Sequence, residues 1–299
     1  MKDIVVLPGP SSVQLGTCIA SSLNADPIDV ELRTFSDGES KIRINANLLN
    51  KKCVVVQSTF PPVDSHYLQT LMMLSYCINS GAAEVIPVIP YMGYARQDRI
   101  FLEGEVVTMA FIAKLFECFR IKDLITIDIH SSKALSCFNL NIFNISSIPL
   151  LAHYAKANFN LNKPLIVSPD HGGAMRARMF AEILKTSFIT LKKNRDRRSG
   201  TITIDENLDI GVKDRDIILL DDMISSGGTI MKAIDVLNKY NCGRIFVMCV
   251  HALSDEKSLD TIKKSGICDI VSTNSIPRSC SKIDLSKEIA KKLSSIFNR

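Results

Sequence analysis

The chain has 299 residues, 46% of them hydrophobic, which is enough for a sizeable core in one large or two ordinary domains. The formal net charge of +5 is too mild to indicate a nucleic-acid partner, and no apolar run reaches the roughly 18 residues that a membrane span needs. The start, "MKDIVVLPGP", is typical of a first strand rather than a signal peptide. Nine scattered cysteines without a CxxC pair favour a reducing cytoplasm over a disulfide scaffold or a zinc site.

Short β-branched runs alternate with amphipathic segments along the chain. One such segment, residues 64–81, predicts a helix that has Leu68, Leu71, Met72 and Ile78 on one face and Gly81 as its stop. The alternation of strand and helix predicts an α/β fold with mostly parallel sheets. The predicted buried strands are 4–8, 54–58, 84–90, 124–130, 165–169, 187–191, 216–222 and 244–251.

A weak internal repeat divides the chain. Residues 53–90 and 216–251 both follow the same plan: a strand, a loop, a helix, a glycine stop and a second strand. This similarity predicts two related α/β domains, 1–146 and 147–299, with the last helix, 284–297, packing on the first domain. The alternative is that any α/β protein looks self-similar at this level.

The stretch "DIILLDDMISSGGTI", residues 216–230, predicts a phosphate site. An apolar strand runs into Asp221 and Asp222, and a small-residue loop then opens a helix whose N–H groups and dipole favour an anion. The chain has no G-x-x-x-x-G-K-[ST] motif, so this is not a Walker loop. The two carboxylates can accept hydrogen bonds from sugar hydroxyls or help to hold a metal ion, so a phosphorylated sugar satisfies both halves of the stretch.

This stretch resembles the phosphoribosyl-pyrophosphate signature of the phosphoribosyltransferase fold. By itself the signature leaves three functions open: a transferase that consumes phosphoribosyl pyrophosphate, an enzyme that makes it, and a regulator that senses it. Five further blocks, in order along the chain, resemble the ribose-phosphate pyrophosphokinase family. They are "FSDGES" (35–40), "YMGYARQDR" (91–99), "TIDIHSS" (126–132), "VSPDHGGAMRAR" (167–178) and "STNSIP" (272–277).

The resemblance implies two phosphoribosyltransferase-like domains and an enzyme that transfers the β,γ-diphosphoryl group of ATP to O1 of ribose 5-phosphate. The products would be AMP and 5-phosphoribosyl 1-pyrophosphate, for nucleotide biosynthesis. Two alternatives are a phosphoribosyltransferase that uses a nucleobase and a non-catalytic synthetase-like regulatory subunit. After "YARQDR" the chain reads "IFLEGE", where many relatives have several basic residues, so the short, less basic form is similar to archaeal members.

The resemblance also implies an ATP site shared between the subunits of a homo-oligomer, a dimer or larger, with the "FSDGE" loop supplied by the neighbour. The chemistry of this loop agrees, because adenine can stack on an aromatic ring and donate its amino hydrogens to carboxylates. The implied ATP-binding residues are Phe35, Asp37, Gly38, Glu39, Arg96 and Gln97. The implied ribose 5-phosphate site comprises Arg195, Asp221, Asp222, Ser225, Ser226, Gly227, Gly228 and Thr229.

His130 and Asp170 each close a predicted strand. Asp128 lies two positions before His130, and alternation along a strand would place both side chains on one face. The resemblance implies that His130 and Asp170 hold Mg²⁺, which needs few protein ligands because it keeps several waters. The implied diphosphate loop is Asp170, His171, Gly172 and Gly173.

The segment "LKKNRDRRSG", residues 191–200, packs five basic side chains around one acid. A charged run is usually a solvated loop, but this one follows a predicted strand and can serve as a flap beside phosphates. The family has a K-x-R pair in this place, and Lys193 and Arg195 match it, so the resemblance implies that these two are catalytic. Lys192 is the alternative if the pattern is slipped by one residue.

Overall fold

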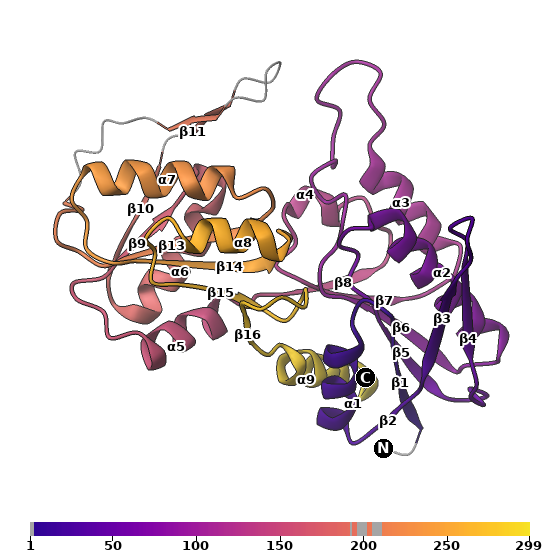
Figure 1. The fold of residues 1–299 in the computed structure, drawn as a ribbon. Coiled ribbons are helices and arrows are strands. Elements are labelled where there is room, and N and C mark those ends of the chain that lie inside the picture. The colour runs from indigo at the N-terminus through magenta and orange to yellow at the C-terminus, as the bar shows by residue number, and fades with distance from the viewer. Residues whose placement is uncertain (1–2, 192, 196–201, 205–210) are drawn as a thin grey trace. The chain divides into compact units, whose positions relative to one another are not determined.

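The computed structural model describes residues 3–191, 193–195, 202–204 and 211–299. By the packing of the chain it divides into two compact units. The first unit comprises Met1–Ser146 and Asp284–Arg299, and the second comprises Ser147–Ile283. Each unit has its own α/β architecture (Figure 1), as the alternation of strands and helices predicted.

The first unit is built on a six-stranded sheet. Its strands lie in the order β2-β1-β5-β6-β7-β8, and all of the pairings are parallel. A separate antiparallel hairpin, β3–β4, follows the second strand along the chain. The strands are β1 (Ile4–Pro8), β2 (Asp26–Pro27), β3 (Val30–Thr34), β4 (Ser40–Ile44), β5 (Lys52–Val56), β6 (Glu84–Ile89), β7 (Asp123–Ile127) and β8 (Asn141–Ile145).

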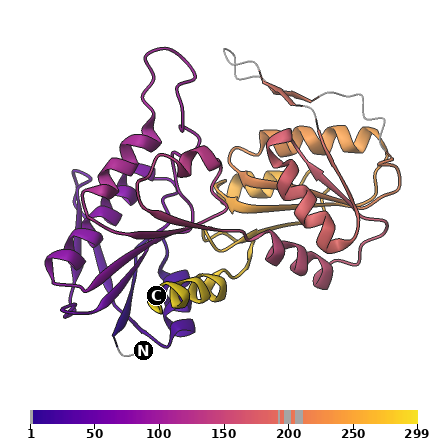
Figure 2. The ribbon, with the colours of Figure 1, turned by 180° about the vertical axis from the view of Figure 1, so that it is seen from behind.

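Helices cover the first sheet on two sides. Buried side chains of α2 and α3 share one hydrophobic core with the sheet, to which β1 contributes Val5 and Leu7. On the other side α1 packs against α9, as both views show (Figures 1 and 2). Lys52 donates a hydrogen bond of 3.1 Å to the carbonyl of Phe297 and so ties the end of α9 to β5. The helices are α1 (Val13–Leu23), α2 (Val63–Asn79), α3 (Thr108–Glu117), α4 (Ser132–Leu135) and α9 (Ser286–Phe297).

The buried face of α2 is not the face that its apolar spacing indicated. Leu68 is 51% exposed and Ile78 is 38% exposed, so these residues point outward. The face toward the core instead carries Tyr67, Thr70, Met73, Leu74 and Cys77. Apolar residues occupy both faces of this helix, so periodicity alone could not decide which face is buried. The predicted stop is confirmed, because α2 ends just before Gly81, which has a φ of +74°.

The second unit repeats the topology of the first. Its six strands lie in the order β10-β9-β13-β14-β15-β16, with parallel pairings, and the antiparallel hairpin β11–β12 again follows the second strand. The repeat seen in the sequence therefore corresponds to β5-α2-β6 in the first unit and β13-α7-β14 in the second. The strands are β9 (Leu165–Ser168), β10 (Ser187–Thr190), β11 (Lys193–Arg195), β12 (Ile202–Ile204), β13 (Ile217–Ile224), β14 (Ile245–Ala252), β15 (Asp269–Thr273) and β16 (Ser281–Ile283).

The second sheet is sandwiched between helices. The helices α7 and α8 cover one of its faces, and α5 and α6 cover the other (Figures 1 and 2). A second hydrophobic core joins β9, β13 and β14 to α7 and α8. The helices are α5 (Ile148–Asn158), the short 3₁₀ turn η1 (His171–Gly173), α6 (Ala174–Leu184), α7 (Gly228–Lys239) and α8 (Glu256–Lys263). None of the helices within the described ranges is long and apolar enough to cross a membrane.

Candidate active site

The candidate phosphate loop joins β13 to α7 in the second unit. It comprises residues 225–227, and α7 begins at Gly228. Gly227 is required at the turn for two reasons: its φ is +77°, and a Cβ there would lie 2.8 Å from the side chain of Ile262. Among the residues that the structure describes, no acceptor receives the backbone N–H of Ser225, Ser226 or Gly227. The loop therefore presents N–H groups at a helix N-terminus, which suits an anion.

The two aspartates lie inside strand β13 and not at its end. The sequence predicted that the strand stops at Asp221 and Asp222, but the parallel ladder with β14 continues to Ile224. The Asp222 N–H donates to Asp221 Oδ1 at 2.9 Å. Asp222 is only 4% exposed, and its carboxylate lies 3.6 Å from Nη2 of Arg176.

Asp221 has an unusual electrostatic environment. Burial, together with the nearby carboxylates of Asp222 and Asp170, raises its pKa well above the ordinary value. A perturbed carboxylate of this kind beside an anion loop is typical of a functional site. A sugar hydroxyl or a cation near Asp221 would relieve the electrostatic cost of its negative charge.

Asp170 organises the turn after β9. Its carboxylate caps η1 by accepting the Gly173 N–H at 3.2 Å, and the ring of His171 lies 3.1 Å from the hydroxyl of Thr190. A Cβ on Gly173 would lie 2.1 Å from the Ser168 hydroxyl, so only glycine fits there. Helix α6 follows η1 directly.

The basic segment falls partly outside the described residues. Lys193 and Arg195 belong to β11, which pairs with β12. Lys192 and residues 196–201 lie outside the part of the chain that the structure describes. The backbone of 193–195 is extended.

In the first unit the "FSDGES" block forms the tip of the β3–β4 hairpin. Two backbone hydrogen bonds close the turn, from Phe35 N to Glu39 O at 2.9 Å and from Gly38 N to Phe35 O at 3.0 Å. Gly38 has a φ of +93°, which favours glycine. The side chains of Phe35, Asp37 and Glu39 are exposed, and the guanidinium of Arg33 lies 5.0 Å from the Phe35 ring centre.

Within the first unit, the "ARQD" block connects the predicted ATP-binding residues to the turn that carries His130. Arg96 and Gln97 are exposed, and Gln97 accepts a hydrogen bond of 2.5 Å from the Thr108 hydroxyl. Asp98 is buried, and its hydrogen bonds from Arg99 (2.6 and 2.7 Å) lower its pKa to about 2. The carboxylate of Asp98 also accepts a hydrogen bond of 2.5 Å from the hydroxyl of Ser131, the residue after His130.

The prediction that Asp128 and His130 share one face of a strand is wrong. Strand β7 ends at Ile127, and Asp128 adopts a φ of +35°, so strand alternation does not extend to these residues. Asp128 is buried, whereas His130 is exposed. His130 belongs to the first unit and Asp170 to the second.

Comparisons with known proteins cover nearly the whole chain. Residues 4–119 match the N-terminal domain of ribose phosphate pyrophosphokinase, and residues 145–281 match the phosphoribosyl transferase domain. The ribose-phosphate pyrophosphokinase of Methanobrevibacter smithii is 33% identical over 96% of this chain and 98% of its own. This chain belongs to the ribose-phosphate pyrophosphokinase family.

Other members of the family are similarly close. The ribose-phosphate pyrophosphokinase of Sulfurisphaera tokodaii is 30% identical over 97% of this chain and 100% of its own. That of Haemophilus influenzae is 31% identical over 93% of this chain and 89% of its own. The crystal structure of phosphoribosylpyrophosphate synthetase from Mycobacterium smegmatis matches with a TM-score of 0.88, at 20% identity and over 99% of both chains. This structural match confirms the predicted fold of two phosphoribosyltransferase-like domains.

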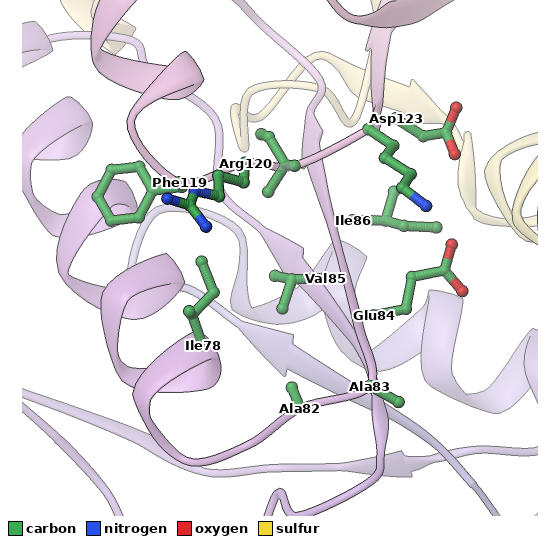
Figure 3. Close-up of a pocket in the computed structure, with 11 residues that line it drawn as sticks. Ile78, Ala82, Ala83, Glu84, Val85, Ile86, Phe119, Arg120 and Asp123 are labelled. Atoms are coloured by element: carbon green, nitrogen blue, oxygen red, sulfur yellow. The ribbon is translucent and has the colours of Figure 1, made fainter.

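A surface cavity in this family member lies away from the predicted site. It has a volume of about 400 Å³ and lies where β6 and β7 begin, lined by residues 82–86 and 119–123 together with Ile78 (Figure 3). None of its lining residues belongs to the motifs that carry the family resemblance. Ligands of parallel α/β sheets bind at the other, carboxyl ends of the strands, so the cavity is not the candidate active site.

Two residues of the candidate site were not singled out from the sequence, although both lie within the family motifs. Arg176 pairs with Asp222, and its buried Nε has no hydrogen-bond partner within the described part of the chain. Asp98 connects the "ARQD" block to Ser131. The only sequence signal was their position inside "VSPDHGGAMRAR" and "YMGYARQDR", because their partners are distant in the chain.

Proposed function

We propose that this chain transfers the β,γ-diphosphoryl group of ATP to O1 of ribose 5-phosphate, giving 5-phosphoribosyl 1-pyrophosphate and AMP. The observation that carries the proposal is full-length similarity to ribose-phosphate pyrophosphokinases, together with an anion loop beside an acid pair in the second unit. A bond forms between O1 of the sugar and the β-phosphorus, and the bond between that phosphorus and the α,β-bridging oxygen breaks. AMP leaves with that oxygen.

The second unit binds the sugar phosphate in this proposal. The N–H groups of the loop after β13 hold the 5-phosphate, and Thr229 in the first turn of α7 adds its hydroxyl. Asp221 and Asp222 accept hydrogen bonds from the ribose hydroxyls. Binding those hydroxyls satisfies Asp221, the carboxylate whose pKa is raised well above its ordinary value.

The moving diphosphate is held by other residues of the second unit. The turn of Asp170, His171, Gly172 and Gly173 supplies backbone N–H groups beside it. Lys193 and Arg195 stabilise the charge that develops on the phosphoryl oxygens. Catalysis then rests mainly on positioning and on charge neutralisation.

ATP binding is assigned to the first unit. Adenine stacks on Phe35, and Asp37 and Glu39 accept hydrogen bonds from its amino group. Gly38 permits the turn that exposes these three side chains. Arg96 and Gln97 complete the nucleotide site.

We infer that Mg²⁺ takes part in the reaction, and His130 in the first unit and Asp170 in the second are each of a residue type that can ligate it. Throughout the described residues there is no group of three or more metal-ligating side chains. Such side chains would suit an ion that keeps most of its waters and neutralises phosphate oxygens. When bound, the ion supplies charge neutralisation to those oxygens.

The reaction predicts AMP as the nucleotide product. Purified protein with ATP, ribose 5-phosphate and Mg²⁺ should release AMP in step with loss of ribose 5-phosphate, measured by nucleotide chromatography. ADP as the product would mean transfer of the γ-phosphoryl group and would refute the proposal. Omitting the sugar is the control, because AMP release that persists without it would indicate simple hydrolysis.

We also infer that the protein is a cytoplasmic homo-oligomer. All nine cysteines are free, as expected in a reducing compartment. An apolar groove of about 590 Å³ lies between the β3–β4 hairpin and the outward face of α2, lined by Ile42, Leu68, Leu71, Met72 and Tyr76 among others. A second copy seated there would lie beside the hairpin whose tip carries the adenine-binding residues.

Disrupting this groove should dissociate the oligomer. We expect Leu68→Glu to lower the mass measured by light scattering and to reduce AMP release at least about tenfold, because it places a charge in an apolar contact. Val13→Glu changes an equally exposed apolar residue (57%, against 51% for Leu68) on α1 and should leave both measurements unchanged. Unaltered mass in Leu68→Glu would show that this groove is not the interface.

A further inference from the structure

The candidate phosphate loop is held from behind by residues 253 and 254. The backbone N–H groups of Leu253 and Ser254 both donate to the carbonyl oxygen of Ile224, at 2.9 Å. The Ser254 hydroxyl donates to the carbonyl of Ser225 and lies 3.3 Å from that of Ile224. Ser254 is 3% exposed, so the donor side of these bonds is shielded from water.

These hydrogen bonds determine which way the loop's N–H groups point. In a trans peptide the C=O of one residue and the N–H of the next lie on opposite sides. A carbonyl of Ile224 held inward therefore turns the N–H of Ser225 outward. In the same way, holding the carbonyl of Ser225 inward turns the N–H of Ser226 outward. With the carbonyls turned outward instead, the loop would present oxygen atoms to a phosphate and repel it.

Ser254 is held in turn by the segment that follows "STNSIP", the one family motif to which no role has been assigned. The guanidinium of Arg278 donates from Nε to the carbonyl of Ser254 at 2.8 Å. The next residue, Ser279, donates its hydroxyl to Glu256 at 2.5 Å, at the first turn of α8. The side chain of Ile262, in the same helix, packs against Gly227 of the loop.

We propose that Ser254 is a positioning residue for binding of the sugar 5-phosphate, and that Arg278 holds it in place. The inference rests on the proposed function, because it takes the bound anion to be the phosphate of ribose 5-phosphate. Ser254 does not touch this ligand. It acts through the carbonyls of Ile224 and Ser225, which set the direction of the loop's donors.

The test is a comparison of KM values for the two substrates. Ser254→Ala should raise the KM for ribose 5-phosphate about tenfold, as expected when a buried carbonyl loses its donor, and change the KM for ATP less than about twofold. Ser254→Thr keeps the hydroxyl and should restore most of the loss. Ser286→Ala removes an equally buried serine hydroxyl (2% exposed) from its bond to Asp284 in the first unit, and should change neither KM.

Equal rises in both KM values, or an unchanged KM for ribose 5-phosphate, would overturn the inference. If Ser254→Ala does not fold, Arg278→Lys replaces it, because lysine lacks the forked donors, and the same selective rise is required. Calorimetric titration with ribose 5-phosphate in the absence of ATP separates the two proposals. If the unaltered protein binds the sugar phosphate but releases no AMP, only the proposed function fails. If it does not bind the sugar phosphate, the inference fails too.

Discussion

Lys193→Ala should lower kcat by about 10²–10³, with little change in KM for either substrate. That range, about 2.7–4 kcal/mol, is typical of deleting one preorganised group that stabilises charge in a transition state. We expect kcat to fall and KM to stay nearly constant, because such a cation acts mainly after the substrates are bound. The measurement is steady-state AMP release at saturating ATP and ribose 5-phosphate.

Lys192→Ala is the matched control, because it removes the same charge from the neighbouring position. Only Lys193 has an arginine two residues further along, in the extended strand β11. We therefore expect Lys192→Ala to reduce kcat much less. If Lys192→Ala is the more damaging change, the family pattern is slipped by one residue, and both Lys193 and Arg195 lose their assigned roles.

Asp221→Asn should weaken binding of ribose 5-phosphate and at the same time stabilise the fold. Loss of hydrogen bonds to a charged acceptor predicts a fall in kcat/KM for the sugar of about 10- to 100-fold. The asparagine removes a charge that burial, Asp222 and Asp170 all disfavour. A gain of about 1 kcal/mol would raise Tm by about 2–4 °C in a unit of this size.

The pH dependence of this stabilisation has a definite sign. Because the folded-state pKa of Asp221 is raised, its protonated form stabilises the fold, and that stability is lost as the pH rises through the raised pKa. The gain in Tm from Asp221→Asn should therefore be present at neutral pH and vanish below about pH 4, the unfolded-state value. A gain that is constant with pH would contradict this account.

Asp222→Asn provides the contrast for these measurements. Asp222 is paired with Arg176, so its replacement leaves a half-buried guanidinium without its carboxylate. We expect it to lower Tm, even though it also weakens sugar binding. Thermal unfolding of both variants over the same pH series makes the comparison.

Much of the architecture could be predicted because short stretches of the sequence indicate its strands and turns. Strand β1 and the first half of β13 are continuous apolar runs, and Gly81 and Gly227 mark turns that need a positive φ. The hairpin β3–β4 was not predicted, because its strands carry charged residues and little burial. The buried face of α2 was predicted wrongly, because this helix has more apolar residues than the core can cover.

The residues of the candidate site could be proposed one by one from the family motifs, but the contacts among them could not. Asp98 meets Ser131, and Arg176 meets Asp222, across long stretches of chain that only the fold brings together. The predicted placement of Asp128 on a strand face was wrong, because strand β7 ends before it and its φ is +35°. Local sequence patterns do not encode tertiary pairings of this kind, which depend on the packing of whole elements.

The two antiparallel hairpins occupy the same place in the topology of each unit, immediately after the second strand of the sheet. One bears the aromatic and acidic tip, and the other leads into and out of the cationic segment. Neither hairpin contributes a strand to a six-stranded sheet. Selection could therefore reshape each hairpin without altering the strand order beneath it. A change in the length or charge of either hairpin is therefore expected to leave the six-stranded sheet of its unit intact.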